Sequence, residues 1–175
     1  MKTPRLLLSA VFGLALVGAL RAADEAKPAP RAEVVFFHPE KFADVKDDNV
    51  GSEKGRDAIL GLIRDYVVQQ SAYYVPAGQK LTVTVTDVDL AGDFEPWRGP
   101  NAMDVRIIKD IYPPRVDLAY TLTDASGKVL KEGKRQLRDL AFNMKLSINT
   151  NDPLRHEKAL LDDWFRRDFT RIKSS

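Results

Sequence analysis

The 175-residue chain contains no cysteine, and its 27 Lys and Arg residues nearly balance its 25 Asp and Glu residues. The lack of cysteine excludes disulfides, thiol catalysis and thiolate metal sites, and also a lipid anchor on an amino-terminal cysteine. The balanced charge, without any basic run interleaved with aromatic residues, predicts no binding to nucleic acid.

Residues 1–22 have the pattern of a secretory signal peptide. Two basic residues precede an apolar run of 15 residues, Leu6 to Leu20, and small residues follow it. A transmembrane helix needs ~20 apolar residues, so we predict cleavage after Ala19 or Ala22 and no transmembrane anchor afterwards. A cut at Ala22 removes three basic residues and no acidic one, which leaves a net charge of −1. The predicted location is the periplasm.

Residues 23–31 are predicted to form a flexible leader, and residues 32–173 a single domain. About 150 residues can bury roughly 70% of their unfolded surface without disulfides. The first expected element is a short apolar strand, Ala32 to Phe37, and Ser52 is then expected to cap a helix that ends before Pro76. The expected apolar face of this helix consists of Ile59, Leu62, Ile63, Tyr66 and Val67.

The middle of the chain is rich in strand patterns. Residues 80–86 alternate strictly between apolar and threonine or lysine side chains, which is the strongest strand signal in the chain. Residues 103–111 are assigned as a strand because two prolines follow them. Residues 116–122 and 128–137 flank the turn residues 124–127 and are predicted to form an antiparallel hairpin.

The carboxyl-terminal segment predicts a second helix. Asp152 is a suitable N-cap residue and Pro153 suits the first helical position, and Phe169 and Ile172 extend the pattern. Its apolar stripe consists of Leu160, Leu161, Trp164 and Phe165. The expected fold is therefore α+β, with two main helices packed on one face of a mostly antiparallel sheet of four to five strands.

The stretch TDVDLAGDFEPWRG, residues 86–99, resembles an EF-hand loop when it is counted from Asp87. The fifth place is Ala91, which has no side-chain oxygen, and the twelfth is Arg98 where an EF-hand has a bidentate Glu. The EF-hand interpretation therefore fails.

A metal site of another kind stays open, because calcium accepts flexible oxygen geometry. Its candidate ligands are the acidic cluster Asp87, Asp89, Asp93 and Asp104. We favour a structural alternative in which the strand twists, bulges or leaves the core near Thr86, so that Val88 and Leu90 face inward instead. The carboxylates are then expected to be neutralised by neighbouring cations, with the candidates Arg98, Arg106, Lys109 and Arg115.

The sequence contains no recognisable catalytic set. Its two histidines, His38 and His156, stand far apart, and neither a nucleophile elbow, a zinc-binding HExxH motif nor a glycine-rich phosphate loop is present. We predict no cofactor and no assigned catalytic or metal residue.

The loop after the acidic stretch is the predicted partner-binding site. Phe94, Trp97 and Arg98 lie among prolines and glycines, where an exposed aromatic side chain can anchor a partner. In the alternative, Phe94 and Trp97 fold back over the end of the sheet, as most aromatic side chains are buried.

Several phrases of the sequence resemble an exported bacterial family that is catalogued as domain of unknown function 3016. They are VTVTDVDLAGDFEP, VRIIKDIYPPRVDLAYTLTD, LRDLAF and EKALLDDWFRRDF, and the resemblance spans about residues 33–170. It implies export and a single domain, and it brings no catalytic or ligand residues. The expected architecture also resembles small α+β domains of envelope accessory proteins, an analogy that does not determine function.

The sequence favours a non-enzymatic periplasmic binding or accessory module that contacts another envelope protein. The alternative is a periplasmic metal-dependent hydrolase that uses Asp87 and Asp89, together with Asp104. A third possibility is a structural envelope protein without a defined ligand.

Overall fold

The computed structural model describes residues 30–145 and 150–172 of the chain. The predicted signal peptide and most of the predicted leader lie outside the described residues. The helices and strands are β1 (Ala32–Phe36), α1 (Glu53–Tyr74), β2 (Lys80–Asp89), β3 (Asp93–Phe94), β4 (Arg106–Ile107), β5 (Arg115–Thr123), β6 (Val129–Arg138) and α2 (Arg155–Asp168). Four 3₁₀ turns lie between them, η1 (Pro39–Lys41), η2 (Pro96–Arg98), η3 (Pro100–Ala102) and η4 (Phe142–Met144).

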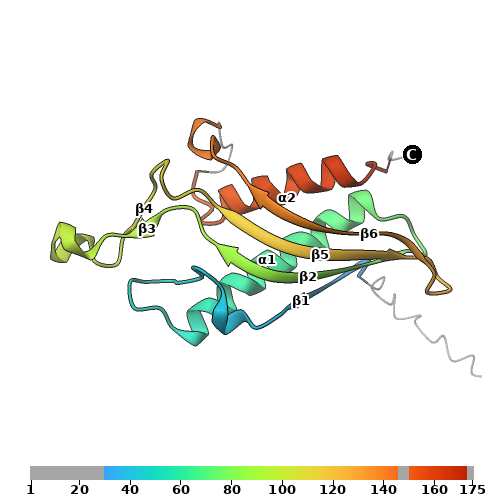
Figure 1. Ribbon diagram of the computed structural model, residues 1–175, viewed down its shortest axis with the longest axis horizontal. Helices are drawn as coiled ribbons and strands as arrows, with labels where there is room; N and C mark the ends of the chain where they lie inside the picture. Colours follow the sequence, from blue (N-terminus) through green and yellow to red (C-terminus); the bar gives the residue numbers. More distant parts are fainter. Residues whose placement is uncertain (1–29, 146–149, 173–175) are drawn as a thin grey trace, which may run out of the picture.

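The main sheet has the strand order β1-β2-β5-β6. β1 is parallel to β2, with α1 as the connection between them, whereas the β2–β5 and β5–β6 pairs are antiparallel. Both helices lie on the same face of this sheet (Figure 1). β3 and β4 form a separate two-stranded sheet. The structure therefore confirms the predicted α+β fold with its mainly antiparallel sheet.

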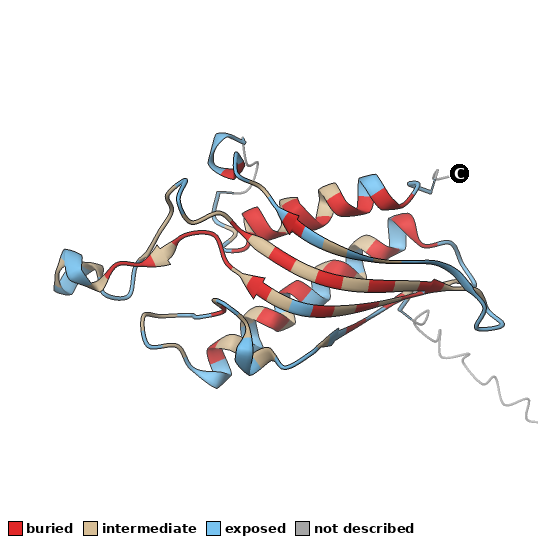
Figure 2. Cartoon of the chain, in the orientation of Figure 1, coloured by how far each residue is buried: buried red, intermediate tan, exposed pale blue. Residues whose placement is uncertain are grey.

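The core lies between the sheet and the two helices. Alternate residues of β2 and β5 are buried, and so are the faces of α1 and α2 that meet them (Figure 2). Trp164 is completely buried and contacts the rings of Tyr120, Phe165 and Phe169. Its indole Nε1–H donates a hydrogen bond of 3.1 Å to Asp168. This aromatic cluster joins α2 to the centre of the sheet.

β2 contains the predicted irregularity. Its register against β5 shifts between Val85 and Asp87, so Thr86 is the extra, exposed residue of a β-bulge. Val88 and Leu90 are buried beyond the bulge, while Asp87 and Asp89 lie on the opposite face. The expectation that the bulge transfers the inward positions to these two residues is confirmed.

The helix ends differ in how well they were predicted. The Ser52 hydroxyl accepts a hydrogen bond of 2.9 Å from the Gly55 N–H, as expected for the cap of α1. α2 begins later than predicted, at Arg155, so Asp152 is not its N-cap and Pro153 is not its first residue. The Asp152 carboxylate instead accepts a hydrogen bond of 2.9 Å from the Leu154 N–H, which closes a turn before the helix.

Three further expectations were wrong. Leu62, assigned to the apolar face of α1, is exposed, and α2 ends at Asp168, before Phe169 and Ile172. Within residues 103–111 only Arg106–Ile107 forms a strand. The rest of this segment consists of turns and irregular backbone, so most of its residues lack a neighbouring strand.

Candidate functional site

β3, β4 and the residues between them project beyond the end of the main sheet (Figure 1). We name residues 93–107 the arm. Gly92 precedes it with a φ of +79°, and a Cβ atom there would lie 2.6 Å from the carbonyl oxygen of Ile107. The Gly92 N–H also donates a hydrogen bond of 3.0 Å to the Tyr112 carbonyl. Only glycine allows the outgoing and returning chains to lie so close together.

A buried carboxylate organises the tip of the arm. Glu95 is only 1% exposed, and it accepts hydrogen bonds from Lys109 (2.5 Å), from Arg98 and from the Tyr112 hydroxyl (3.2 Å). The hydrogen bond from Lys109 lowers the pKa of Glu95, against the opposing effect of burial, and the bonds from Arg98 and Tyr112 lower it further. Glu95 is thus held as a charged anchor for the loop that follows it.

A second charged residue ties the arm to the segment before α1. Arg106 lies 2.7 Å from a carboxylate oxygen of Asp44, and it donates hydrogen bonds to the carbonyls of Gly92 (3.0 Å) and Lys46 (2.9 Å). Its guanidinium group also lies over the ring of buried Phe94, 4.6 Å from the centroid. Arg106 therefore fixes the base of the arm from three sides.

The structure separates the three residues of the predicted partner-binding loop. Phe94 is buried, as the fold-back alternative expected for both aromatic residues. Arg98 is half-exposed and paired with Glu95. Trp97 is 72% exposed on η2, at the tip of the arm.

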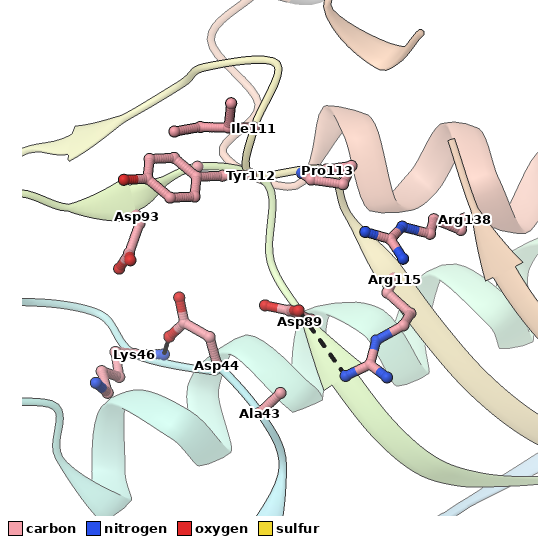
Figure 3. Close-up of a pocket in the computed structure, with 11 residues that line it drawn as sticks. Ala43, Asp44, Lys46, Asp89, Asp93, Ile111, Tyr112, Pro113, Arg115 and Arg138 are labelled. Carbon is pink, nitrogen blue, oxygen red and sulfur yellow. Dashed lines mark hydrogen bonds and ion pairs between the residues drawn. The ribbon is translucent and has the colours of Figure 1, made fainter. Parts of the chain in front are cut away.

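An open cleft of about 420 Å³ lies at the base of the arm. Carboxylates of Asp44, Asp89 and Asp93 point into it, and Arg115 and Arg138 lie beside Asp89 (Figure 3). The cleft is also lined by Lys46, Ile111, Tyr112 and Pro113. It thus combines both charge signs with an aromatic wall.

Two residues of the acidic cluster lie together at the end of β2. Asp87 accepts hydrogen bonds from the Ala43 N–H (2.8 Å) and its own neighbour Val88 (3.0 Å), and its second oxygen lies 2.6 Å from Arg115. Asp89 is 3.9 Å from the same guanidinium group. Burial raises the pKa of Asp89, and Arg115 only partly opposes this effect.

The other two members of the cluster are separate. Asp93 accepts a hydrogen bond of 2.7 Å from the Phe94 N–H on the far side of the cleft, whereas Asp104 is exposed in the arm. Of the four cations expected to neutralise the cluster, Arg115 does so for Asp87. Arg106 pairs with Asp44, and Arg98 and Lys109 pair with Glu95. Within the described ranges, no group of three or more His, Cys, Asp or Glu side chains could hold a metal ion.

Two functional anchors were missed by the sequence reasoning, Glu95 and Glu157. Glu157, in the first turn of α2, accepts a hydrogen bond of 2.7 Å from the Ala91 N–H just before the arm. Its burial raises its pKa. The only sequence signal for Glu95 was the cation three residues later, and nothing local connected Glu157 to residue 91.

The histidines lie on separate elements. His156 is buried with its ring against Phe142, at a centroid distance of 4.8 Å. His38 is exposed and lies 3.1 Å from Glu40.

A family model described as a protein of unknown function, DUF3016, matches residues 30–167. This range covers the main sheet, the arm and nearly all of α2. No curated protein and no solved structure matches the chain. In the described part of the chain, neither helix has the length and apolar character that crossing a bilayer requires.

Proposed function

Because this chain belongs to the DUF3016 family, whose function is unknown, we propose its role from its own geometry. We infer that it is a non-enzymatic binding module of the cell envelope, that it acts in the periplasm, and that its arm contacts another envelope protein. The observation that carries this proposal is the 72% exposure of Trp97 on an arm that is held by the buried carboxylate of Glu95 and by the partly buried ion pair of Arg106 and Asp44.

An exposed tryptophan on a braced loop is suited to protein recognition. Tryptophan is among the residues that contribute most to binding when a partner buries them. Glu95 and Arg106 already order the arm, so the entropy lost on binding is reduced. Met103 and Val105 on the same arm are also exposed and add apolar surface to it.

Affinity capture from envelope extracts tests the role of the arm, with Trp97→Ala as the variant. We expect the variant to lose the captured partner while its circular dichroism spectrum is unchanged. Leu130→Ala is the matched control, because Leu130 is also an exposed apolar residue but lies at the start of β6, remote from the arm. An identical set of partners for Trp97→Ala and the unaltered protein would assign recognition to another surface.

The periplasmic location rests on the amino-terminal sequence pattern and is tested separately. Cell fractionation of the carboxyl-terminally tagged protein should recover a shortened chain in the periplasmic fraction. Recovery of the full-length chain in the cytoplasm would contradict it.

The second candidate function is a metal-dependent hydrolase at Asp87 and Asp89. Its support is limited to Asp89, which lines the cleft, whereas Asp87 does not line it and is paired with Arg115. No described group of three or more His, Cys, Asp or Glu side chains could hold a metal ion, which favours the binding module. A cleft of about 420 Å³ with three carboxylates is large enough for a small substrate. Calorimetric titration with calcium or zinc distinguishes the two functions. Heat at micromolar metal that is absent in Asp87→Asn would favour the hydrolase over the binding module.

A further inference from the structure

The cleft at the base of the arm keeps its two kinds of charge apart. The carboxylates of Asp44, Asp89 and Asp93 point into it from one side, and the guanidinium groups of Arg115 and Arg138 lie on the other (Figure 3). Acidic and basic side chains are equal in number in the lining, three of each, so the cleft has no net charge that would attract a simple ion. It is suited to a neutral ligand whose own charges are separated.

Arg138 supplies the cationic end of the cleft. It lies directly opposite Arg115 in the register of β5 and β6, where like charges repel each other. Arg115 is compensated by three carboxylates, those of Asp87 (2.6 Å), Asp117 (3.8 Å) and Asp89 (3.9 Å). Within the part of the chain that the structure describes, Arg138 forms no ion pair. Its N–H groups can therefore donate to an anionic group of a ligand.

Asp93 supplies the anionic end. One of its oxygens accepts the hydrogen bond from the Phe94 N–H, and no cation of the described residues pairs with the carboxylate. Asp89 also lines the cleft, and its only ion pair, with Arg115, is a long one of 3.9 Å. A protonated amine has three N–H donors, which two incompletely paired carboxylates can accept.

The remaining two charged residues of the lining are directed elsewhere. Asp44 is occupied by Arg106, at 2.7 Å. The side chain of Lys46 extends toward Gly51, where an added Cβ atom would lie 3.0 Å from the Lys46 Cγ atom. Neither residue therefore neutralises the two ends of the cleft.

Tyr112 gives the cleft a fixed wall between these ends. Its hydroxyl donates a hydrogen bond of 3.2 Å to Glu95, and its carbonyl accepts one of 3.0 Å from the Gly92 N–H. Ile111 and Pro113, its neighbours in the chain, extend the wall. The carbon chain of a ligand can lie against this surface while its charged groups reach the two ends. The volume of about 420 Å³ is typical of small-molecule sites.

We propose that the cleft binds a small linear zwitterion, a compound with a carboxylate at one end and a protonated amine at the other. The carboxylate of the ligand accepts hydrogen bonds from Arg138, and its amine donates to Asp93 and Asp89. Its carbon chain lies along the wall formed by Tyr112. The site is distinct from the exposed tryptophan of the arm and does not rest on the proposed function.

Calorimetric titration of the purified protein at low ionic strength tests the proposal. The probes are 5-aminopentanoate and glycylglycine, which have equal numbers of bonds between the amine and the carboxylate carbon. Pentanoate and pentylamine, which each lack one charge, are the matched controls. We expect at least one zwitterion to bind about tenfold or more tightly than either control, because each control loses a hydrogen bond between charged groups. Tighter binding of glycylglycine would identify the ligand as a peptide.

Two results of this titration overturn the proposal. One is an affinity for pentanoate or for pentylamine equal to that for both zwitterions, which would show that a single charge is recognised. The other is the absence both of heat and of a shift in the NMR signal of the Gly92 amide, which lines the cleft, with either zwitterion.

Two variants assign the ends of the ligand. Arg138→Gln should weaken binding of the zwitterion about tenfold and leave pentylamine unaffected, whereas Asp93→Asn should weaken the zwitterion equally and leave pentanoate unaffected. Lys134→Gln, on the same outward face of β6, and Asp104→Asn, exposed in the arm, are the matched controls and should change no affinity. Unaltered binding of the zwitterion by both Arg138→Gln and Asp93→Asn contradicts the assigned geometry.

Discussion

The body of the protein, made of the main sheet and two helices, and the arm are stabilised by different forces. The body buries an aromatic cluster around Trp164. The arm buries one aromatic side chain, Phe94, and is otherwise held by ion pairs of Glu95 and Arg106. Burial of apolar surface is insensitive to moderate changes of pH, whereas ion pairs require both partners to be charged. The stability of the arm therefore depends more strongly on pH than the stability of the body.

The largest effect should follow from removing the centre of the body. Trp164→Ala deletes a completely buried indole and its contacts with three rings, so we expect a loss of about 3–5 kcal/mol in the free energy of unfolding. Urea denaturation measures it. Trp97→Ala, the same change at the tip of the arm, should cost less than about 0.5 kcal/mol. Similar losses for both variants would contradict the contrast between the two regions.

Arg106→Lys should have an intermediate effect. Lysine retains the charge but cannot reach Asp44 and the carbonyls of Gly92 and Lys46 at once. We expect a loss of about 1–3 kcal/mol in the local stability of the arm, with little change in the midpoint of global unfolding. Hydrogen exchange of arm and body amides measures the two separately. Equal deprotection of both regions would show that the arm is not an independent unit.

Acidification below pH 4.5 should have the smallest effect, and it should act on the arm first. The pKa of Glu95 is lower than its ordinary value of 4.5, mainly because Lys109 donates a hydrogen bond to it. Its contribution is therefore complete above pH 4.5 and is lost as the pH falls through the lowered value. In a Trp164→Phe background, fluorescence from Trp97 alone reports this transition.

Two comparisons sharpen the acid experiment. Glu95→Gln should abolish the transition of Trp97, because the titrating group is gone. Glu157 behaves in the opposite way: burial raises its pKa, so its contribution to stability increases as the pH falls from the raised value toward 4.5. The body should therefore keep its circular dichroism signal while the arm changes. Simultaneous loss of both signals would count against independent titration.

The sequence predicted the body far better than the arm, for a physical reason. Strict alternation in β2 and the paired patterns of β5 and β6 follow from burial of one sheet face, which local sequence records. The bulge at Thr86 was predictable because two carboxylates could not occupy inward positions without great cost.

The arm and its site depend on contacts between distant residues. β3 and β4 have two residues each, too few for a periodic pattern, and Glu95 is buried only because Lys109 and Tyr112 return to it. Asp152 failed as a cap because the same side chain can close a turn before the helix. Such choices between two local hydrogen bonds are decided by packing elsewhere.

The extra residue in β2 lies a few residues before the arm, and a bulge bends the strand that contains it, so we expect it to affect the direction in which the arm projects. Thr86 contributes no side chain to the interior, and its hydroxyl donates a hydrogen bond of 3.2 Å to the Asp117 carbonyl. Deleting it would restore simple alternation from Val85 to Val88 and leave every interior side chain in place. The bend that the bulge introduces would disappear, and the arm would then project in a different direction. A single exposed threonine thus links the register of the core strand to the direction of the arm that follows it.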